Sequence, residues 1–129
     1  MARFFDDYQK LAHETSFHPK PSLDGLNYAL LGLGNECGEL QGKFKKLLRG
    51  DKPGLKNKME VALATGGCYL PETEEFRAMM AGELGDVLWY LSEVATMLGT
   101  SLDRVASDNI QKLRSRAQAG TIKGDGDNR

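Results

Sequence analysis

Apolar residues recur along this chain in steps of three and four, which is the spacing of one face of an α-helix. The spacing predicts a short helix over roughly residues 3 to 15 and a turn at 16 to 21, where two prolines lie. Ser22 is placed to cap a long second helix, and Gly50 is placed to end it. The apolar stripe of this second helix consists of Leu23, Leu26, Leu30, Leu33, Cys37, Leu40, Phe44 and Leu47.

The same pattern returns in the second half of the chain. Thr73 and Gly99 are placed to cap and to end a third helix, and Ser101 to cap a fourth. The third stripe consists of Met80, Leu84, Val87, Leu91, Val94 and Leu98, and the fourth of Leu102, Val105, Ala106, Ile110 and Leu113.

Residues 51 to 72 interrupt the helical pattern with prolines and glycines. Leu55 to Leu63 favours a short helical turn within this segment. Because the segment is longer than a tight connection, three interpretations stay open: a lid, an oligomer contact or a plain insertion.

These patterns predict an all-α fold, an antiparallel bundle of about four main helices, in a single domain spanning 1–129. No segment shows the alternation of a β-strand. The two long apolar seams exceed what a lone small bundle needs, so we expect an oligomer. The end, 118–129, is rich in glycine and charge, which is typical of a disordered tail.

The overall charge limits the classes of partner. The formal net charge is −1, so bulk charge indicates neither a nucleic-acid polymer nor a membrane as partner. No apolar run is long enough to span a bilayer, and the first residues lack the apolar stretch of a signal peptide. Cys37 and Cys68 are too few for a disulfide framework. We therefore expect a cytoplasmic protein.

Two short acidic steps carry the candidate chemistry, Glu36 with Glu39 and Glu83 with Asp86. Each step places two carboxylates about one helical turn apart, beside an apolar stripe. If the two helices pack together, four like charges share one space, and a divalent cation offsets their repulsion. Oxygen-only ligands favour Mg²⁺, Mn²⁺ or Ca²⁺ over zinc.

For either helix alone, a solvated edge with Glu–Lys pairs explains its acidic step equally well. A di-iron carboxylate bundle is disfavoured, because that class supplies Glu-x-x-His pairs and no histidine lies near either step. His13 and His18 both lie near the N-terminus and are interpreted as surface or packing residues.

The paired steps, the second running on into Val87-Leu88-Trp89-Tyr90-Leu91, resemble the MazG-like group of all-α nucleoside triphosphate pyrophosphohydrolases. The stretch 109–116 and the ending Gly-Asp-Gly-Asp-Asn-Arg resemble the same group. The likeness covers roughly residues 23–48 and 73–129. It implies Mg²⁺-dependent hydrolysis of a nucleoside triphosphate to the monophosphate and pyrophosphate, in a dimer or tetramer.

The resemblance also implies roles for single residues. The carboxylates of Glu36, Glu39, Glu83 and Asp86 would hold the metal. Glu39 lies furthest round from the apolar seam, so we expect it to act as general base. Contacts to the triphosphate or its sugar are expected from Lys43, Tyr90, Asn109, Lys112, Arg116 and Arg129.

Two features depart from the resemblance. Asn35 stands where many members carry a further acidic residue, and the 51–72 segment is longer than the link in compact members. The main alternative to an enzyme is a non-catalytic helical oligomer that binds a nucleotide or metal in a regulatory role.

Overall fold

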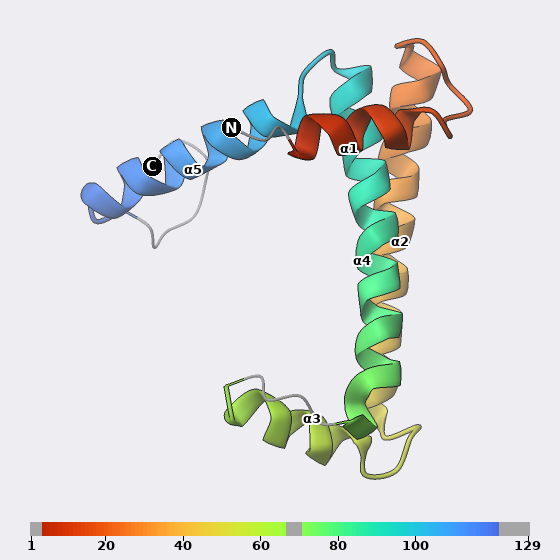
Figure 1. Cartoon of the computed structure of the whole chain (residues 1–129), viewed down its shortest axis with the longest axis vertical. Helices are drawn as coiled ribbons and strands as arrows, with labels where there is room; N and C mark the ends of the chain where they lie inside the picture. Colours follow the sequence, from red (N-terminus) through yellow and green to blue (C-terminus); the bar gives the residue numbers. More distant parts are fainter. Residues whose placement is uncertain (1–3, 67–70, 122–129) are drawn as a thin grey trace. The chain divides into compact units, whose positions relative to one another are not determined.

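A computed structural model describes residues 4–66 and 71–121 of the chain, and within them every regular element is a helix (Figure 1). The predicted all-α class is therefore confirmed. In addition to the four expected helices the structure has α3, in the segment where a short helical turn is predicted. The elements are α1 (Phe4–His13), α2 (Leu23–Arg49), α3 (Leu55–Ala64), the 3₁₀ turn η1 (Pro71–Thr73), α4 (Glu74–Met97) and α5 (Leu102–Gln118).

The helix ends follow the predicted local chemistry. Ser22 and Ser101 each accept a hydrogen bond on Oγ from the backbone N–H three residues later, at 3.0 and 3.2 Å. Gly50 and Gly99 follow α2 and α4 with φ of 84° and 68°, a left-handed conformation that glycine adopts without steric cost. These caps and stops are confirmed as the sequence predicted them.

The chain forms two compact units, which are described separately: one of residues 27–91, and one of the described residues on either side of that range. In the 27–91 unit, α2 and α4 lie side by side (Figure 1). Tyr28, early in this part of α2, pairs with Tyr90 late in α4, and Leu47 clusters with Phe76 near the opposite ends. The two helices therefore run antiparallel. A closed four-helix bundle and a single domain of residues 1–129 stay predictions.

The core of the 27–91 unit lies where α2, α3 and α4 meet. Leu47, Leu55 and Phe76 are buried there, one from each helix. The residues of 51–72 that the structure describes therefore contribute to the core, because Leu55 belongs to α3. The partly buried side chains packed against this cluster are Met59, Met79 and Met80.

In the other unit, α1 satisfies the first turn of α5. The first N–H groups of a helix have no partner within the helix. Here the N–H of Leu102 donates to Gln9 Oε1 at 2.8 Å, and that of Asp103 to Asp6 Oδ1 at 3.4 Å. The short N-terminal helix is thus fixed to α5 by hydrogen bonds that α5 needs.

The same face of α1 also binds the end of α4. Gln9 Nε2 donates to Thr96 Oγ1 at 2.9 Å and to the Thr100 carbonyl at 3.0 Å. His13 Nδ1 lies 3.0 Å from one carboxylate oxygen of Glu93 and 3.2 Å from the other. Glu93 is 2% exposed and His13 is half-buried, so this pair is a structural contact. It agrees with the interpretation of His13 as a packing residue.

The antiparallel pair of α2 and α4, called the hairpin below, leaves several large apolar side chains at the surface. Large apolar side chains of the hairpin that stay exposed are Leu30, Leu31, Phe44, Leu48, Leu84 and Leu91.

No helix in residues 4–66 or 71–121 has the length and hydrophobicity needed to cross a membrane.

Candidate metal centre

The antiparallel register of α2 and α4 brings carboxylates from both helices together. Glu36 and Glu39 lie one turn apart on α2, and Glu83 on α4 faces them across the hairpin. One oxygen from each of the three lies within 4.8 Å of the others. Glu36 and Glu83 are half-buried, and Glu39 is exposed. Three of the four carboxylates that the two acidic steps are expected to bring together therefore meet, and Asp86 is not among them.

Neighbouring polar groups neutralise this cluster only in part. Asn35 Nδ2 donates to Glu39 at 3.0 Å and to Glu36 at 3.5 Å. Lys43 Nζ lies 3.6 Å from Glu83 Oε1. One lysine cannot balance three carboxylates, and like charges this close disfavour one another's ionisation. Hard oxygen ligands in such a group suit Mg²⁺, Mn²⁺ or Ca²⁺, so the donor set fits the expected cation.

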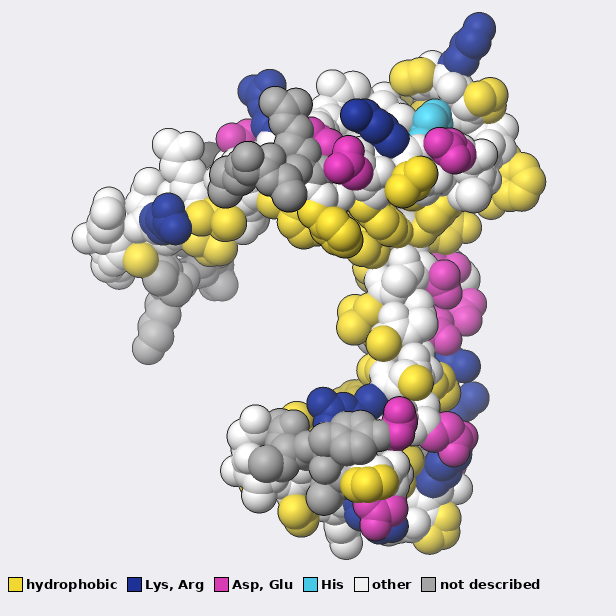
Figure 2. Space-filling view, in the orientation of Figure 1, with side chains coloured by type: hydrophobic (Ala, Val, Ile, Leu, Met, Phe, Trp, Pro, Cys, Tyr) yellow, Lys and Arg dark blue, Asp and Glu magenta, His cyan; other side chains and the backbone are white. Residues whose placement is uncertain are grey.

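The acidic side chains form a visible group in this part of the molecule. Figure 2 shows Asp and Glu gathered on one side of the hairpin's middle, with Lys and Arg next to them toward α3. An acidic metal site beside a basic surface suits a triphosphate, because a cation and lysines can share its negative charge.

Asp86, the fourth predicted ligand, is exposed and lies one turn beyond Glu83 on α4. It is not part of the group of three oxygens within 4.8 Å. Its charge and that of Glu36 both act on the Tyr90 hydroxyl. Asp86 thus lies in the same neighbourhood, and its role as a ligand stays a prediction.

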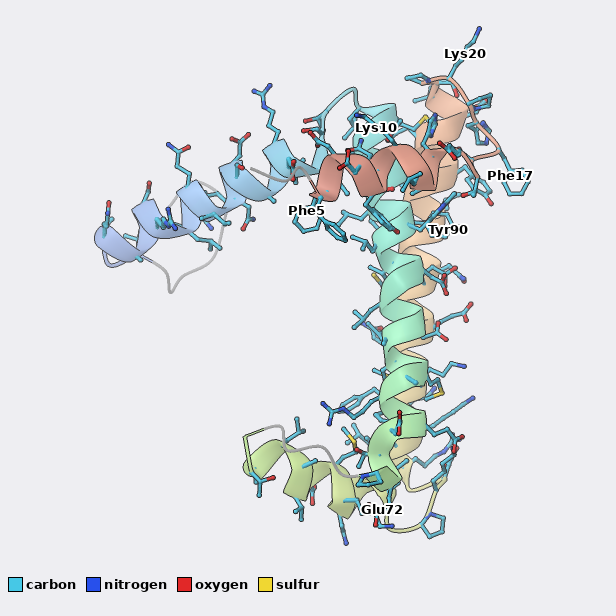
Figure 3. All side chains as sticks on the ribbon, in the orientation of Figure 1. Phe5, Lys10, Phe17, Lys20, Glu72 and Tyr90 are labelled. Atoms are coloured by element: carbon cyan, nitrogen blue, oxygen red, sulfur yellow. The ribbon has the colours of Figure 1, made fainter. Side chains whose placement is uncertain are left out.

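Tyr90 is held as a neutral phenol beside the carboxylates. A hydrogen bond to Tyr28, burial, and the charges of Glu36 and Asp86 raise the pKa of Tyr90 to about 12. The hydroxyls of Tyr90 and Tyr28 are thus hydrogen-bonded to each other beside the carboxylates. Figure 3 shows the Tyr90 side chain extending from α4 toward α2.

The region that contains this cluster matches a known family. The model of the MazG nucleotide pyrophosphohydrolase domain matches residues 27–121. The chain belongs to the MazG family. It is 38% identical over 128 residues to the gene 37 protein of Mycobacterium phage L5, covering 96% of this chain and 97% of that protein. No solved structure matches the chain. The resemblance inferred from the two acidic steps is therefore confirmed.

Other residues expected to contact substrate in this MazG chain lie outside the 27–91 unit. Asn109, Lys112 and Arg116 are on α5, the first two exposed and Arg116 half-buried. Arg129 lies outside the described residues. The roles of all four stay predictions.

The sequence patterns do not reveal the contacts of two residues beside the acidic cluster. Asn35 was noted only as the loss of an acidic residue, whereas its amide donates to both carboxylates of the first step. Tyr28 was not considered. It lies two turns before Glu36 on α2, and its pairing with Tyr90 depends on the register of the two helices.

Proposed function

We propose that this protein hydrolyses nucleoside or deoxynucleoside triphosphates to the monophosphate and pyrophosphate, with Mg²⁺, or Mn²⁺ in its place, and so clears unwanted nucleotides from the pool. The observation that carries the proposal is the group of Glu36, Glu39 and Glu83 oxygens within 4.8 Å of one another, inside the region that the MazG domain matches.

In this proposal the carboxylates have two roles, cation binding and proton transfer. Glu36, Glu83 and Asp86 hold the cation, which when bound offsets phosphate charge and makes a water more acidic. Glu39 would also be a ligand of the cation and, as the exposed member of the group, would accept the proton of the attacking water. The amide of Asn35 orients Glu39 for this role, because it donates to that carboxylate at 3.0 Å.

Cationic and hydroxyl groups hold the substrate in this scheme. Lys43 already lies against Glu83 and can exchange that contact for a phosphate oxygen. Tyr90, as a neutral phenol, lines the sugar or phosphate pocket. The remaining contacts are assigned to Asn109, Lys112, Arg116 and Arg129.

One experiment tests the reaction directly. Purified protein is incubated with Mg²⁺ and a panel of NTPs and dNTPs, and the products are separated. Monophosphate and pyrophosphate are expected, and both should disappear with chelator. Nucleoside diphosphate plus orthophosphate would contradict the proposed bond cleavage. Tight nucleotide binding without turnover would favour the non-catalytic regulatory oligomer.

We also propose that two or four copies assemble through the hairpin. Leu31 and Leu84, at 69% and 53% exposed, are too large and apolar to stay in water without cost. Light scattering at micromolar concentration should give a dimer or tetramer, and a stable monomer would refute the assembly. A cytoplasmic location stays a prediction.

A further inference from the structure

Gly32 on α2 occupies a position that a side chain cannot share with Tyr90. A Cβ built at Gly32 would lie 2.0 Å from Tyr90 Cε1 and 2.4 Å from Cζ, closer than real contacts allow. The same construction at Gly34, Gly38 and Gly42 on this helix meets nothing within 4 Å. Glycine is less favourable than alanine inside a helix, so the Tyr90 ring gives Gly32 a steric reason that the other three lack.

Two further aromatic residues hold the Tyr90 ring in this place. Tyr28 lies with its ring centroid 6.1 Å away, and its hydroxyl is hydrogen-bonded to that of Tyr90. Trp89 packs edge-on against the ring, at 4.8 Å and 85°. A ring fixed by a helix backbone, a hydrogen bond and an edge contact has little rotational freedom left.

The position of the ring relates it to both acidic steps. Gly32 lies one turn before Glu36 on α2, and Tyr90 lies one turn after Asp86 on α4. We propose that Gly32 and Tyr28 are positioning residues of the nucleotide site, which hold the Tyr90 ring against α2 as a wall beside the carboxylates. This inference rests on the proposed function, in which Tyr90 contacts the sugar or phosphates.

The test compares Gly32→Ala with Gly34→Ala, two identical changes two residues apart on one helix. In Gly32→Ala the Tyr90 ring must move, so KM for the best substrate of the panel should rise about tenfold with a smaller change in kcat. In Gly34→Ala both constants should match those of the unchanged protein. Trp89 is the chain's single tryptophan, so its fluorescence reports displacement of the neighbouring ring without any assay of activity.

Two further variants make the test robust. In a Tyr90→Ala background the ring is absent, so adding Gly32→Ala should change neither Trp89 fluorescence nor KM. Tyr28→Phe keeps the tilted ring contact but removes the hydroxyl that is hydrogen-bonded to Tyr90, and should raise KM about threefold. This variant keeps the proposal testable even where Gly32→Ala fails to fold.

The outcomes separate the two proposals. Equal fluorescence and equal KM in Gly32→Ala and Gly34→Ala, or an unchanged KM in Tyr28→Phe, would overturn the positioning role. An unmodified protein that releases no pyrophosphate from any triphosphate would overturn the proposed function instead. In that case Trp89 fluorescence still decides whether Gly32 seats the Tyr90 ring.

Discussion

Two glutamates on the same helix, Glu83 and Glu93, have opposite surroundings. Glu93 is 2% exposed, and His13 lies within 3.2 Å of both its carboxylate oxygens. Glu83 has Lys43 at 3.6 Å but shares its space with two further carboxylates. A buried charge is tolerated where the fold supplies its partner, whereas a cluster of like charges lowers stability. The first arrangement is therefore structural, and the second is what a cation site requires.

The amides beside these glutamates differ in the same way. Gln9 uses both ends of its side chain, donating to Thr96 and to the Thr100 carbonyl and accepting from the Leu102 N–H. Asn35 is exposed and donates only toward the acidic cluster. In the unit that contains α1 these polar groups join helices, whereas in the 27–91 unit the carboxylates of Glu36, Glu39 and Glu83 face one another.

Neutralising one carboxylate of the acidic cluster should have the largest effect on activity. Glu36→Gln, Glu83→Gln or Asp86→Asn should each lower pyrophosphate release by about a hundredfold or more, because charge stabilisation worth several kcal/mol is lost. The melting temperature should stay or rise, because repulsion between the carboxylates falls. Glu60→Gln on α3 is the control, since that exposed glutamate has only a helical-neighbour pair with Lys56 at 3.9 Å. Full activity in any of the three site variants would remove that residue from the ligand set.

Removing His13, the partner of Glu93, should lower stability and not pyrophosphate release. His13→Ala leaves a buried carboxylate without its hydrogen-bond partner, which should lower the free energy of unfolding by about 2 kcal/mol. That figure is below the range for a fully buried pair because the His13 side chain is 25% exposed. Urea denaturation measures the change, with Glu14→Ala, an exposed neighbour, as control. Equal midpoints for the two variants would show that the pair is not structural.

Mg²⁺ should stabilise the folded protein by binding the carboxylates of the acidic cluster, Glu36, Glu39 and Glu83. A cation that binds the folded state at ten times its Kd adds about 1.4 kcal/mol. Mg²⁺ should therefore raise the melting temperature of the unmodified protein, and chelator should reverse the rise. Glu36→Gln should show little of it, while Glu93→Gln, outside the cluster, should keep the full shift. A shift of the same size in Glu36→Gln would place the cation elsewhere.

The smallest expected difference is between the two amides. Gln9→Ala should lower stability by about 1 kcal/mol, because it leaves the Leu102 N–H without its acceptor. Asn35→Ala should stay within about 0.5 kcal/mol, because Asn35 is exposed. Chemical denaturation of both variants side by side measures the difference. A larger loss of stability in Asn35→Ala than in Gln9→Ala would contradict the structural role given to Gln9.

The sequence by itself determined the features that depend on residues near one another in the chain. The caps at Ser22 and Ser101 and the stops at Gly50 and Gly99 use contacts within about one turn, so local patterns predicted them. The one-turn spacing inside each acidic step is equally local, and together the two steps identified the MazG family.

Tertiary packing fixes which residues from distant parts of the sequence meet. The approach of Glu83 to Glu36 and Glu39, the support of Tyr90 by Gly32, and the bonds of Gln9 depend on the register of helices far apart in sequence. A slip of about one helical turn would leave the apolar stripe facing the neighbouring helix but would replace every such partner. Periodicity therefore predicts the helices and their apolar faces, whereas side-chain packing selects the polar contacts that make the site.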